Sequence, residues 1–427
     1  MKLLTSEIAD YQWVYSMDKT TNISSLLAWL DSSPTPVHVV HTAVQQLEAS
    51  GFNEQKDFSS DLCAKGFYRN NGSIIAWSLG QAGAPFRIVG AHTDSPNLRI
   101  QPQPDIARMG WNQLGIEIYG GVLLNSWLDR DLGIAGRVFS ADGQESLFHQ
   151  AQPLARVPQL AIHLDREISE RGLLLDKFHH TSPLWGTKAP MFLDWLSQIT
   201  GVSHIASFDA HLFDVTPAAI LGVDGSLLAS GRLDNQLSCW AAVEAICHVN
   251  SPFTSIVILN DHEEVGSEST TGAAGPMLEN LLAVIDERDS LTSGQRIDRA
   301  QQSWCLSADN AHAVHPNYIE KHDPRHSPLP NHGVVLKLNG NQRYATSPSG
   351  AAHIRNIAHK QNIELQTFVS RNNMPCGSTI GPITSTRLGI EAIDVGVPQL
   401  SMHSARELCG TSDAMDLVTL MQGFIQN

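Results

Sequence analysis

The sequence lacks the closely spaced cysteine pairs of disulfide-rich and thiolate-metal proteins. Its six cysteines, in a chain of 427 residues, are scattered without any C-x-x-C spacing. This distribution argues against a disulfide framework and against a cysteine-ligated zinc site. Reduced, buried thiols in a cytoplasmic protein are the plain interpretation, so we expect a cytoplasmic protein held together by its core.

Basic residues and long apolar runs are also scarce. Lys and Arg number 28 against 43 Asp and Glu, which gives a formal net charge of −15. Such a charge disfavours nucleic acids and anionic membrane surfaces as partners. No apolar run approaches the roughly 20 residues needed to cross a bilayer. The first residues, MKLLTSEIADYQWVYS, contain no continuous apolar core, so we expect no secretory signal.

The composition that remains is that of a globular chain with more than one domain. Hydrophobic residues make up 42% and charged residues 17%, and the length favours two or three domains. The first fifty residues have a helical pattern, in which Asn22 or Ser24 is the expected cap of the first helix. Two strands are predicted within residues 73–91, where the apolar pattern changes period.

The rest of the chain divides at about residue 230. Residues 100–229 are richer in Gly, Pro and short β-like runs, whereas helices and continuous apolar strands alternate from residue 230 onward. Such alternation indicates a largely parallel sheet covered on both faces. We therefore predict an α/β domain built from residues 1–99 and 230–427, interrupted by a β-rich domain over residues 100–229.

Acidic residues follow the predicted strand at residues 256–259. In LNDHEEVGSES, Glu263 and Glu264 are adjacent, and they repel each other unless a cation lies beside them. A metal ion would give one carboxylate the role of ligand and the other that of proton acceptor, although the residues alone do not say which is which. For an isolated Glu-Glu pair, a solvated acidic turn is the alternative. The H-E-x-x-H motif is absent, because Gly266 stands in place of its second His.

Four further segments place a candidate ligand where a predicted element begins or ends. In VGAHTDSPNLR, His92 and Asp94 point to the same face of extended chain, so the His can bind a metal while the Asp orients a ligand. A His at a strand end is otherwise more often structural. Asp234 precedes a helix, for which an N-cap is the alternative role. The other two candidates are Asp309 in LSADNAHAVHP and His403 in PQLSMHSARE.

The five segments together predict a metal site. Ligands of open α/β sheets gather at the carboxyl ends of the strands, which is where most of these residues fall. Two His and several carboxylates without Cys suit zinc, cobalt or manganese. The acids are too many for one zinc ion, and a carboxylate that bridges two metals accounts for the excess. No G-x-S-x-G motif occurs, so a serine hydrolase is not supported.

In this order, GAHTDSPNLRI, GRLDNQLSCW, NDHEEVGSES, SADNAHAVHPNY and PQLSMHSARE resemble the signature set of the aspartyl aminopeptidase family of dinuclear zinc peptidases. YGGVLLNSWLDRDLGIAGRV, LNGNQRYATS and MPCGSTIGP also fit, so the resemblance spans nearly the whole chain. It implies removal of the N-terminal residue, with a preference for Asp or Glu, from peptides with free N-termini. It also implies a three-layer zinc-peptidase domain with a mostly parallel mixed sheet, an inserted β-rich dimerisation domain, and a tetrahedral dodecamer built from dimers.

The resemblance assigns roles to the candidate residues. Glu263 is similar to the general base, and Asp234 is similar to the carboxylate that bridges two metal ions. The other expected ligands are His92 and Asp309 for one metal and Glu264 and His403 for the other, with Asp94 as an acid that orients His92. Zinc is the expected metal, with cobalt and manganese as alternatives.

The resemblance also suggests residues that meet the substrate. His163, in VPQLAIHLDREI, is similar to a His that the inserted domain lends to the active site of a neighbouring subunit, where it stabilises the oxyanion. Lys337 resembles the residue that contacts the acidic side chain of the substrate, although a strand Lys on a solvent face is the alternative. Tyr344 and His312 are candidates for the same pocket.

Two other functions remain open from the sequence. One is an N-acyl amino acid deacylase or carboxypeptidase on the same scaffold, which a comparison of free and N-acylated peptides would separate. The other is a non-catalytic binding shell. The complete set of expected ligands together with Glu263 argues against a shell, because a shell has no need of a general base.

Overall fold

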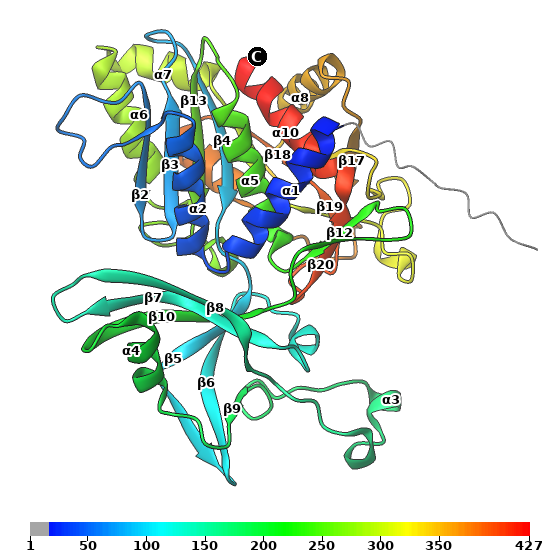
Figure 1. Ribbon diagram of the computed structural model, residues 1–427. Helices are drawn as coiled ribbons and strands as arrows, with labels where there is room; N and C mark the ends of the chain where they lie inside the picture. Colours follow the sequence, from blue (N-terminus) through cyan, green and yellow to red (C-terminus); the bar gives the residue numbers. More distant parts are fainter. Residues whose placement is uncertain (1–16) are drawn as a thin grey trace, which may run out of the picture.

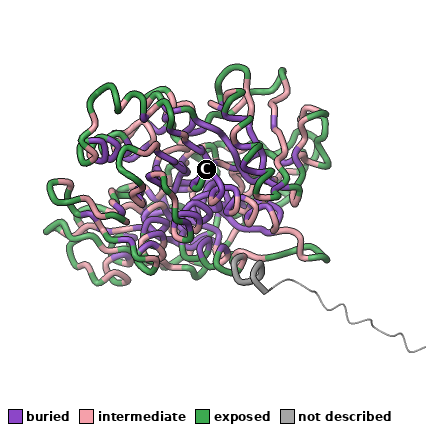
Figure 2. Tube along the Cα trace, turned by 90° about the horizontal axis from the view of Figure 1, so that it is seen from above, coloured by how far each residue is buried: buried purple, intermediate pink, exposed green. Residues whose placement is uncertain are grey.

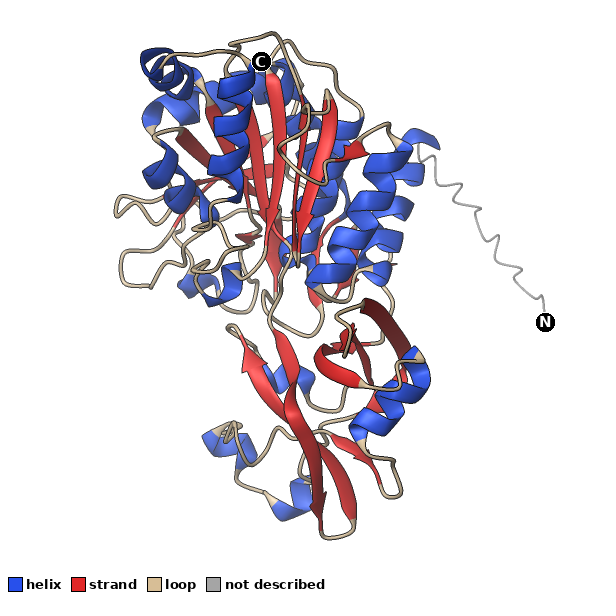
Figure 3. Cartoon of the chain, turned by 90° about the vertical axis from the view of Figure 1, so that its left-hand side faces the viewer, coloured by secondary structure: helices blue, strands red, loops and turns tan. Residues whose placement is uncertain are grey.

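The computed structural model describes residues 17–427, with side chains from residue 23 onward, and these residues form two bodies (Figure 1). The larger body contains a nine-stranded mixed sheet between layers of helices, and the smaller body contains a six-stranded sheet (Figure 3). Buried residues concentrate in the interior of the molecule (Figure 2). This arrangement confirms the predicted α/β class with a β-rich insertion.

The nine-stranded sheet contains, in spatial order, β1 (Asn53–Glu54), β2 (Lys65–Asn70), β3 (Ser73–Ser78), β13 (Thr254–Asn260), β4 (Phe86–His92), β14 (Trp304–Ala308), β18 (Glu391–Gly396), β16 (Val334–Leu338) and β17 (Leu365–Val369). Its four central strands, from β13 to β18, are parallel to one another. On either side of these, β3 and β16 pair antiparallel with β13 and β18. The sheet is therefore mixed, with a parallel centre, as predicted.

Helices cover both faces of this sheet. The helices whose side chains join the larger core are α1 (Met17–Ser32), α2 (Pro36–Ala49), α5 (Leu233–Cys247), α8 (Pro348–Lys360) and α10 (Thr411–Gln426). Those that pack against the core on the other face are α6 (Met277–Arg288), α7 (Ser293–Gln302) and α9 (Ile380–Leu388). The sheet is thus the middle layer of three.

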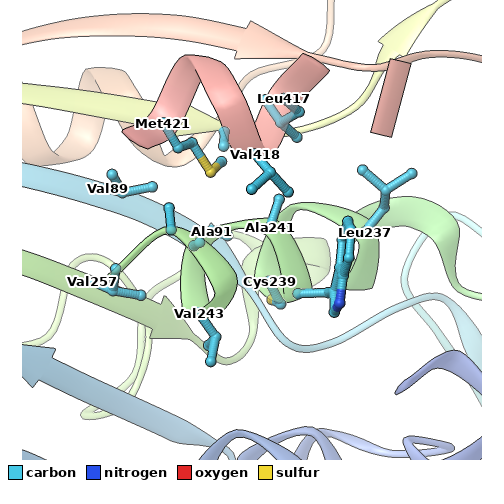
Figure 4. Close-up of a cluster of buried hydrophobic side chains, with 14 of the residues drawn as sticks. Val89, Ala91, Leu237, Cys239, Ala241, Val243, Val257, Leu417, Val418 and Met421 are labelled. Atoms are coloured by element: carbon cyan, nitrogen blue, oxygen red, sulfur yellow. The ribbon is translucent and has the colours of Figure 1, made fainter. Parts of the chain in front are cut away.

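The central strands are apolar on both faces because both faces are buried. In β4, Val89 and Ala91 belong to the larger core, whereas Ile88 belongs to the core on the opposite face. This alternation is the period of two that a strand imposes on its side chains. In Figure 4, Leu237 of α5 and Met421 of α10 lie in the same cluster as Val89 and Ala91. The long apolar strands therefore require cover on both faces, which fixes the three-layer architecture.

The smaller body is an antiparallel sheet with a core of its own. Its strands, in spatial order, are β8 (Glu145–Ala155), β7 (Leu132–Ser140), β10 (Ile205–Asp214), β5 (Asn97–Arg108), β6 (Trp111–Tyr119) and β9 (Leu184–Gly186). Its helices are η1 (Leu124–Trp127), η2 (Ile162–Leu164), α3 (Ile168–Arg171) and α4 (Phe192–Thr200). A separate hydrophobic cluster includes Leu114 of β6, Ile134 of β7 and Phe192 of α4. This body can therefore be treated as an inserted domain.

A third, small sheet lies where the two bodies meet. It contains β11 (Ala219–Leu221), β12 (Leu227–Ser230), β20 (Glu407–Gly410), β19 (Pro398–Leu400) and β15 (Ala311–His312). Strand β11 pairs with β12, and β12 pairs with β20 rather than with the six-stranded sheet, whose last strand along the chain ends at Asp214. The division into residues 1–99, 100–229 and 230–427 stays a prediction.

Most expected elements are present, and one expected boundary is wrong. The helix predicted to be capped by Asn22 or Ser24 begins at Met17, so both residues lie inside α1. Polar residues of this kind occur within helices as well as at their starts, so the capping signal alone does not fix a boundary. Among the described residues, no helix combines the length and the apolarity that crossing a membrane requires.

Candidate active site

Three neighbouring strands bring the first candidate residues to one edge of the sheet. Strand β4 ends at His92, and the parallel register pairs His92 with Asn260 at the end of β13. The short helix η3 (Glu263–Val265) follows β13 directly. On the other side of β4, Asp309 follows β14, and its N–H donates to the carbonyl of Val395 in β18. The carboxyl ends of adjacent parallel strands therefore place these side chains together.

Two further residues reach the same point from other elements. Asp234 lies at the start of α5 with φ −81° and ψ 106°, which are not helical values. His403 lies in the turn after β19 with φ 67°, a left-handed conformation that is uncommon for residues other than Gly. The carboxylate of Asp234 faces two histidines rather than the first turn of its helix, so the N-cap alternative does not describe its surroundings.

These side chains form two groups that share Asp234. In one group, His92 Nε2 lies 3.5 Å from Asp234 Oδ1 and 3.7 Å from Asp309 Oδ1. In the other group, His403 Nε2 lies 3.4 Å from Asp234 Oδ2 and 3.3 Å from Glu264 Oε1. Each group has ligand atoms within 4.8 Å of one another, as a metal ion requires. Asp234 thus turns one oxygen toward each histidine.

Hydrogen bonds fix both histidines in the tautomer that suits a metal ligand. His92 Nδ1 lies 3.0 Å from the backbone carbonyl oxygen of Asp94, and His403 Nδ1 lies 3.1 Å from that of Gly121. A carbonyl oxygen only accepts, so both Nδ1 atoms carry hydrogen and donate. The lone pair of each ring is then on Nε2, which points into the cluster.

The residues present fit divalent metal ions. A tetrahedral zinc ion with bonds of about 2.0–2.1 Å separates its ligand atoms by about 3.3–3.4 Å, close to the distances within each group. Oδ1 of Asp234 and Oε1 of Glu264 are buried and have no hydrogen-bond partner. Buried carboxylate oxygens without partners are costly unless a cation meets them. The imidazole and carboxylate donors suit zinc, cobalt and manganese.

The side chains of the cluster include more acidic groups than their own basic groups can balance. Burial, followed by neighbouring carboxylates, raises the pKa of Glu263 to about 8. Burial also raises the pKa of Glu264 to about 7. Burial alone would lower the pKa of His403, but the neighbouring carboxylates of Asp234 and Glu264 raise it to about 11. Too many negative charges are confined in one volume, and divalent cations would neutralise them.

Asp94 holds the backbone around the cluster. Its Oδ1 accepts the N–H of Glu263 at 3.0 Å, and its Oδ2 accepts the N–H of Glu264 at 3.1 Å. Its Oδ1 also lies 3.5 Å from His92 Nδ1. Burial would raise the pKa of Asp94, but the hydrogen bond and charge of His92 outweigh burial and lower it. The side chain is therefore positioned to orient His92 and the turn that carries both glutamates.

Sequence reasoning did not identify Glu407 or Tyr119. The buried carboxylate of Glu407 accepts the N–H of Asp234 at 2.9 Å and the N–H of His403 at 2.7 Å. The hydroxyl of Tyr119 donates to Asp94 Oδ2 at 2.7 Å. Glu407 stands four residues after His403 in PQLSMHSARE, so its place beside a predicted ligand was the available signal. No local pattern pointed to Tyr119.

The predicted pocket residues lie beside the cluster. Lys337 is 2% exposed, so the solvent-face alternative is wrong, and its Nζ lies 3.3 Å from Asp309 Oδ2 and 5.3 Å from the centre of the Tyr344 ring. Tyr344 and His312 line a cavity of about 200 Å³. Lys321, Arg371 and Asp323 line the same cavity, so its cations outnumber its carboxylate.

His163 does not belong to this cluster within one chain. It lies in η2 of the inserted domain with an exposed side chain, in the segment that precedes α3. Figure 1 draws α3 at the far side of the inserted domain from the nine-stranded sheet. Its expected role in a neighbouring subunit stays a prediction.

Known proteins similar to this chain share one description. The sequence pattern of the family described as Aminopeptidase I zinc metalloprotease (M18) matches residues 29–425. The Probable M18 family aminopeptidase 2 of Streptomyces coelicolor is 46% identical over 421 residues, which cover 94% of this chain and 96% of that protein.

Solved structures extend the similarity to the whole fold. A chain in a structure described as the Ape4 and Nbr1 complex superposes with a TM-score of 0.91 at 33% identity, covering 96% of this chain and 86% of that one. A chain of the S. cerevisiae mApe1 dodecamer superposes with a TM-score of 0.82 at 27% identity, covering 95% of this chain and 97% of that one.

Proposed function

The chain belongs to the M18 family of zinc aminopeptidases, and from that premise we propose that it removes Asp and Glu from peptide N-termini with two divalent metal ions. One observation carries the proposal of two metals. The two oxygens of Asp234 face different histidines, at 3.5 Å and 3.4 Å, and each histidine has a second carboxylate of its own. A single metal ion would use the ligands of only one of these two groups.

Each group has the residues to hold one metal ion. We assign His92, Asp309 and one oxygen of Asp234 to the first, and His403, Glu264 and the other oxygen of Asp234 to the second. When bound, the metals supply Lewis acidity, which makes water a nucleophile at neutral pH and polarises the scissile carbonyl. Zinc is the metal that the family description favours.

Glu263 is the residue that moves the proton. It lies close to His92 and Glu264 but outside the two groups assigned to the metals. Its carboxylate takes a proton from the attacking water and returns it to the leaving amine, as a general base and then a general acid. Asp94 holds the backbone N–H of Glu263 at 3.0 Å and so keeps this side chain at the edge of the cluster.

The surroundings favour a substrate with a free, charged N-terminus and an acidic first residue. The carboxylates of the cluster attract an ammonium group, which supports cleavage of the first peptide bond rather than an internal one. The cavity beside Tyr344 and His312 is also lined by Lys321, Arg371 and Asp323, and Lys337 Nζ lies 5.3 Å from the centre of the Tyr344 ring. These cations favour Asp and Glu over neutral side chains.

We also propose that the chain assembles with copies of itself into a dodecamer of tetrahedral form built from dimers, as one of its structural relatives is described as a dodecamer. Leu164, Leu174 and Phe178 of the inserted domain are 74%, 70% and 81% exposed, and apolar side chains exposed to this extent favour burial against a partner. In such an assembly His163 would reach the active site of another subunit and stabilise the oxyanion. The free cysteines of the chain support a cytoplasmic location.

The test of this proposal combines one substitution with a substrate panel. We expect Glu263→Gln to keep both metal ions and the wild-type assembly while kcat falls by about 10²–10⁴-fold. The wild-type enzyme should hydrolyse aminoacyl substrates of Asp and Glu faster than those of Leu and Ala, should ignore N-acetylated forms, and should stop when a chelator is added.

The matched control is Glu268→Gln, which removes the charge of an exposed glutamate on the same loop. It should retain wild-type kcat. Normal turnover in Glu263→Gln would refute the role of this residue, and one metal per subunit would refute the two-metal assignment. Hydrolysis of the N-acetylated substrates would instead favour a deacylase.

A further inference from the structure

A short segment of the inserted domain, residues 119–126, contacts the metal-binding cluster. This segment comprises the end of β6, the turn after it and most of η1, and it lies between strands β6 and β7 of the six-stranded sheet. It contacts the surroundings of His92 at one end and His403 at the other. The inserted domain is therefore in contact with both halves of the cluster within one chain.

Tyr119 supports the half that contains His92. Its hydroxyl donates to Asp94 Oδ2 at 2.7 Å, and Asp94 in turn faces His92 Nδ1 and the backbone of both glutamates. The tyrosine is itself held within the inserted sheet, because the guanidinium of Arg99 lies 5.3 Å from the centre of its ring. Arg99 is paired with Asp209 on β10. A line of direct contacts thus runs from the inserted sheet to a metal-facing histidine.

The turn that follows Tyr119 supports the half that contains His403. The carbonyl of Gly121 accepts the hydrogen bond of His403 Nδ1 at 3.1 Å, and the N–H of Leu123 donates to the carbonyl of His403 at 3.0 Å. The hydroxyl of Ser126 accepts the N–H of Ala405 at 2.9 Å. His403 occupies a left-handed conformation, which persists only where the surrounding structure holds it. The hydrogen bonds of this segment therefore help to keep His403 in its left-handed conformation.

We propose that residues 119–126 are the positioning element of both metal sites, so that the inserted domain forms part of the catalytic centre of its own chain as well as an assembly surface. The inference rests on the proposed two-metal function. It assigns to Tyr119 and Gly121 a task that is separate from catalysis. Tyr119 orients His92 through Asp94, and Gly121 orients His403 directly, in both cases on the side away from the metal. Contacts of this kind commonly change metal affinity or activity by about 10–100-fold when they are removed.

Two substitutions test the two ends of the segment separately. Tyr119→Phe removes only the hydroxyl that meets Asp94. Gly121→Ala adds a Cβ that would lie 3.1 Å from His403 Nδ1, so that ring must shift by a few tenths of an ångström. Competition with a chromogenic chelator measures the affinity of each variant for zinc alone. We expect each variant to hold one zinc ion as the wild type does and the other about 10–100-fold more weakly, with kcat recovering as free zinc is raised.

The matched controls are Tyr68→Phe, whose ring packs on Phe58 in the larger body, and Gly294→Ala, where an added Cβ meets nothing within 4 Å. Melting temperature and assembly size identify any variant that has lost its fold, and Ser126→Ala then replaces it. Wild-type affinity for both zinc ions in Tyr119→Phe and Gly121→Ala would overturn the inference. A wild-type protein that binds fewer than two zinc ions would instead refute the proposed function.

Discussion

Among individual residues, the buried histidines fall into two kinds according to what surrounds them. His92 and His403 face carboxylates, whose proximity outweighs burial and raises the pKa of each ring. His38 on α2 is 6% exposed, and burial, followed by the charges of His149, His41 and His211, lowers its pKa to about 3. The first kind lies among carboxylates that could share a metal ion with it, whereas the second kind is neutral in the folded protein, and protonating it costs stability.

His38 makes the fold sensitive to acid. In the unfolded chain its pKa is near 6.5, so below that pH the unfolded state binds a proton that the folded state does not, and the free energy of unfolding falls as pH falls toward 3. Between pH 8 and pH 5 this histidine removes about 2 kcal/mol of stability. We expect His38→Gln to flatten the dependence of melting temperature on pH over this range.

The control for this experiment is His359→Gln, which changes an exposed histidine on α8. It should leave the slope of melting temperature against pH as it is in the wild type. An unchanged slope in His38→Gln would show that other groups account for the acid sensitivity. The two variants differ mainly in burial, so the comparison isolates the cost of protonating a buried ring.

Single residues were predictable where their chemistry was visible in a local pattern. His92 and Glu264 lie beside apolar strands whose ends are apparent in the sequence. The sequence did not show which of Glu263 and Glu264 is the metal ligand and which is the general base. The two residues are adjacent, and only the conformation of the turn decides where each side chain points. Tyr119 was missed because its partner, Asp94, is distant in sequence and belongs to another body. Whether each ligand binds as assigned stays a prediction.

At the scale of elements, the end of β18 packs closely on the turn that carries Asp309. A Cβ added at Gly396 would lie 1.9 Å from the carbonyl oxygen of Asp309. The same two segments are joined by the hydrogen bond from the N–H of Asp309 to Val395. Gly396 is therefore required by a close approach of two backbones, and this approach sets the position of a candidate ligand.

We expect Gly396→Ala to displace Asp309 and weaken the metal site of His92. The backbone contact cannot be relieved by a side-chain rotation, so the turn after β14 must move. Zinc content should fall toward one ion per subunit, and kcat should fall by about tenfold or more. Measuring zinc per subunit by mass spectrometry checks the prediction.

Gly340→Ala is the matched control, because an added Cβ there meets nothing within 4 Å. It should keep full zinc content and activity. Full zinc content in Gly396→Ala would show that the turn relaxes without moving the carboxylate of Asp309. The packing of β18 would then not determine the geometry of the metal site.

Elements were predicted well where their periodicity was continuous. The strands at β4, β13 and β14 and the helices α5 and α10 were all expected from apolar runs or amphipathic patterns, and the structure confirms them. Helices α6, α7 and α9 were not predicted. Of these, α7 has a single buried residue, Arg299, so its sequence carries little of the apolar pattern that identifies a helix. The small third sheet was missed because its strands are short and far apart in the chain.

For the whole molecule, the inserted domain presents an apolar surface that the chain itself does not cover. Leu160, Leu164 and Leu174 border a hollow of about 700 Å³ on this domain. Phe178, which is 81% exposed, lies in the same part of the chain. Burying a side chain of this size stabilises an interface by about 1.5–3 kcal/mol, and a symmetric assembly repeats that gain at each copy.

We expect Leu174→Asp combined with Phe178→Asp to reduce the size of the assembly, because each substitution would place a charge in an apolar contact. Light scattering coupled to size-exclusion chromatography should detect smaller species at micromolar concentration. Ile297→Asp, at an apolar side chain exposed on α7 of the larger body, is the control and should keep the wild-type mass. An unchanged mass in the double variant would place the subunit contacts elsewhere.

The cluster draws its ligands from positions as far apart as His92 and His403, with the whole inserted sheet between them. Closing so long a loop is slow, because the entropy of the chain must be lost before the distant contacts form. Strands β2 and β3 can pair early because they are adjacent in the chain, yet the turn that carries His403 must dock before the second half of the cluster exists. The time at which the second metal ion is bound during refolding would therefore report the final docking step. A refolding chain would have no peptidase activity before that step.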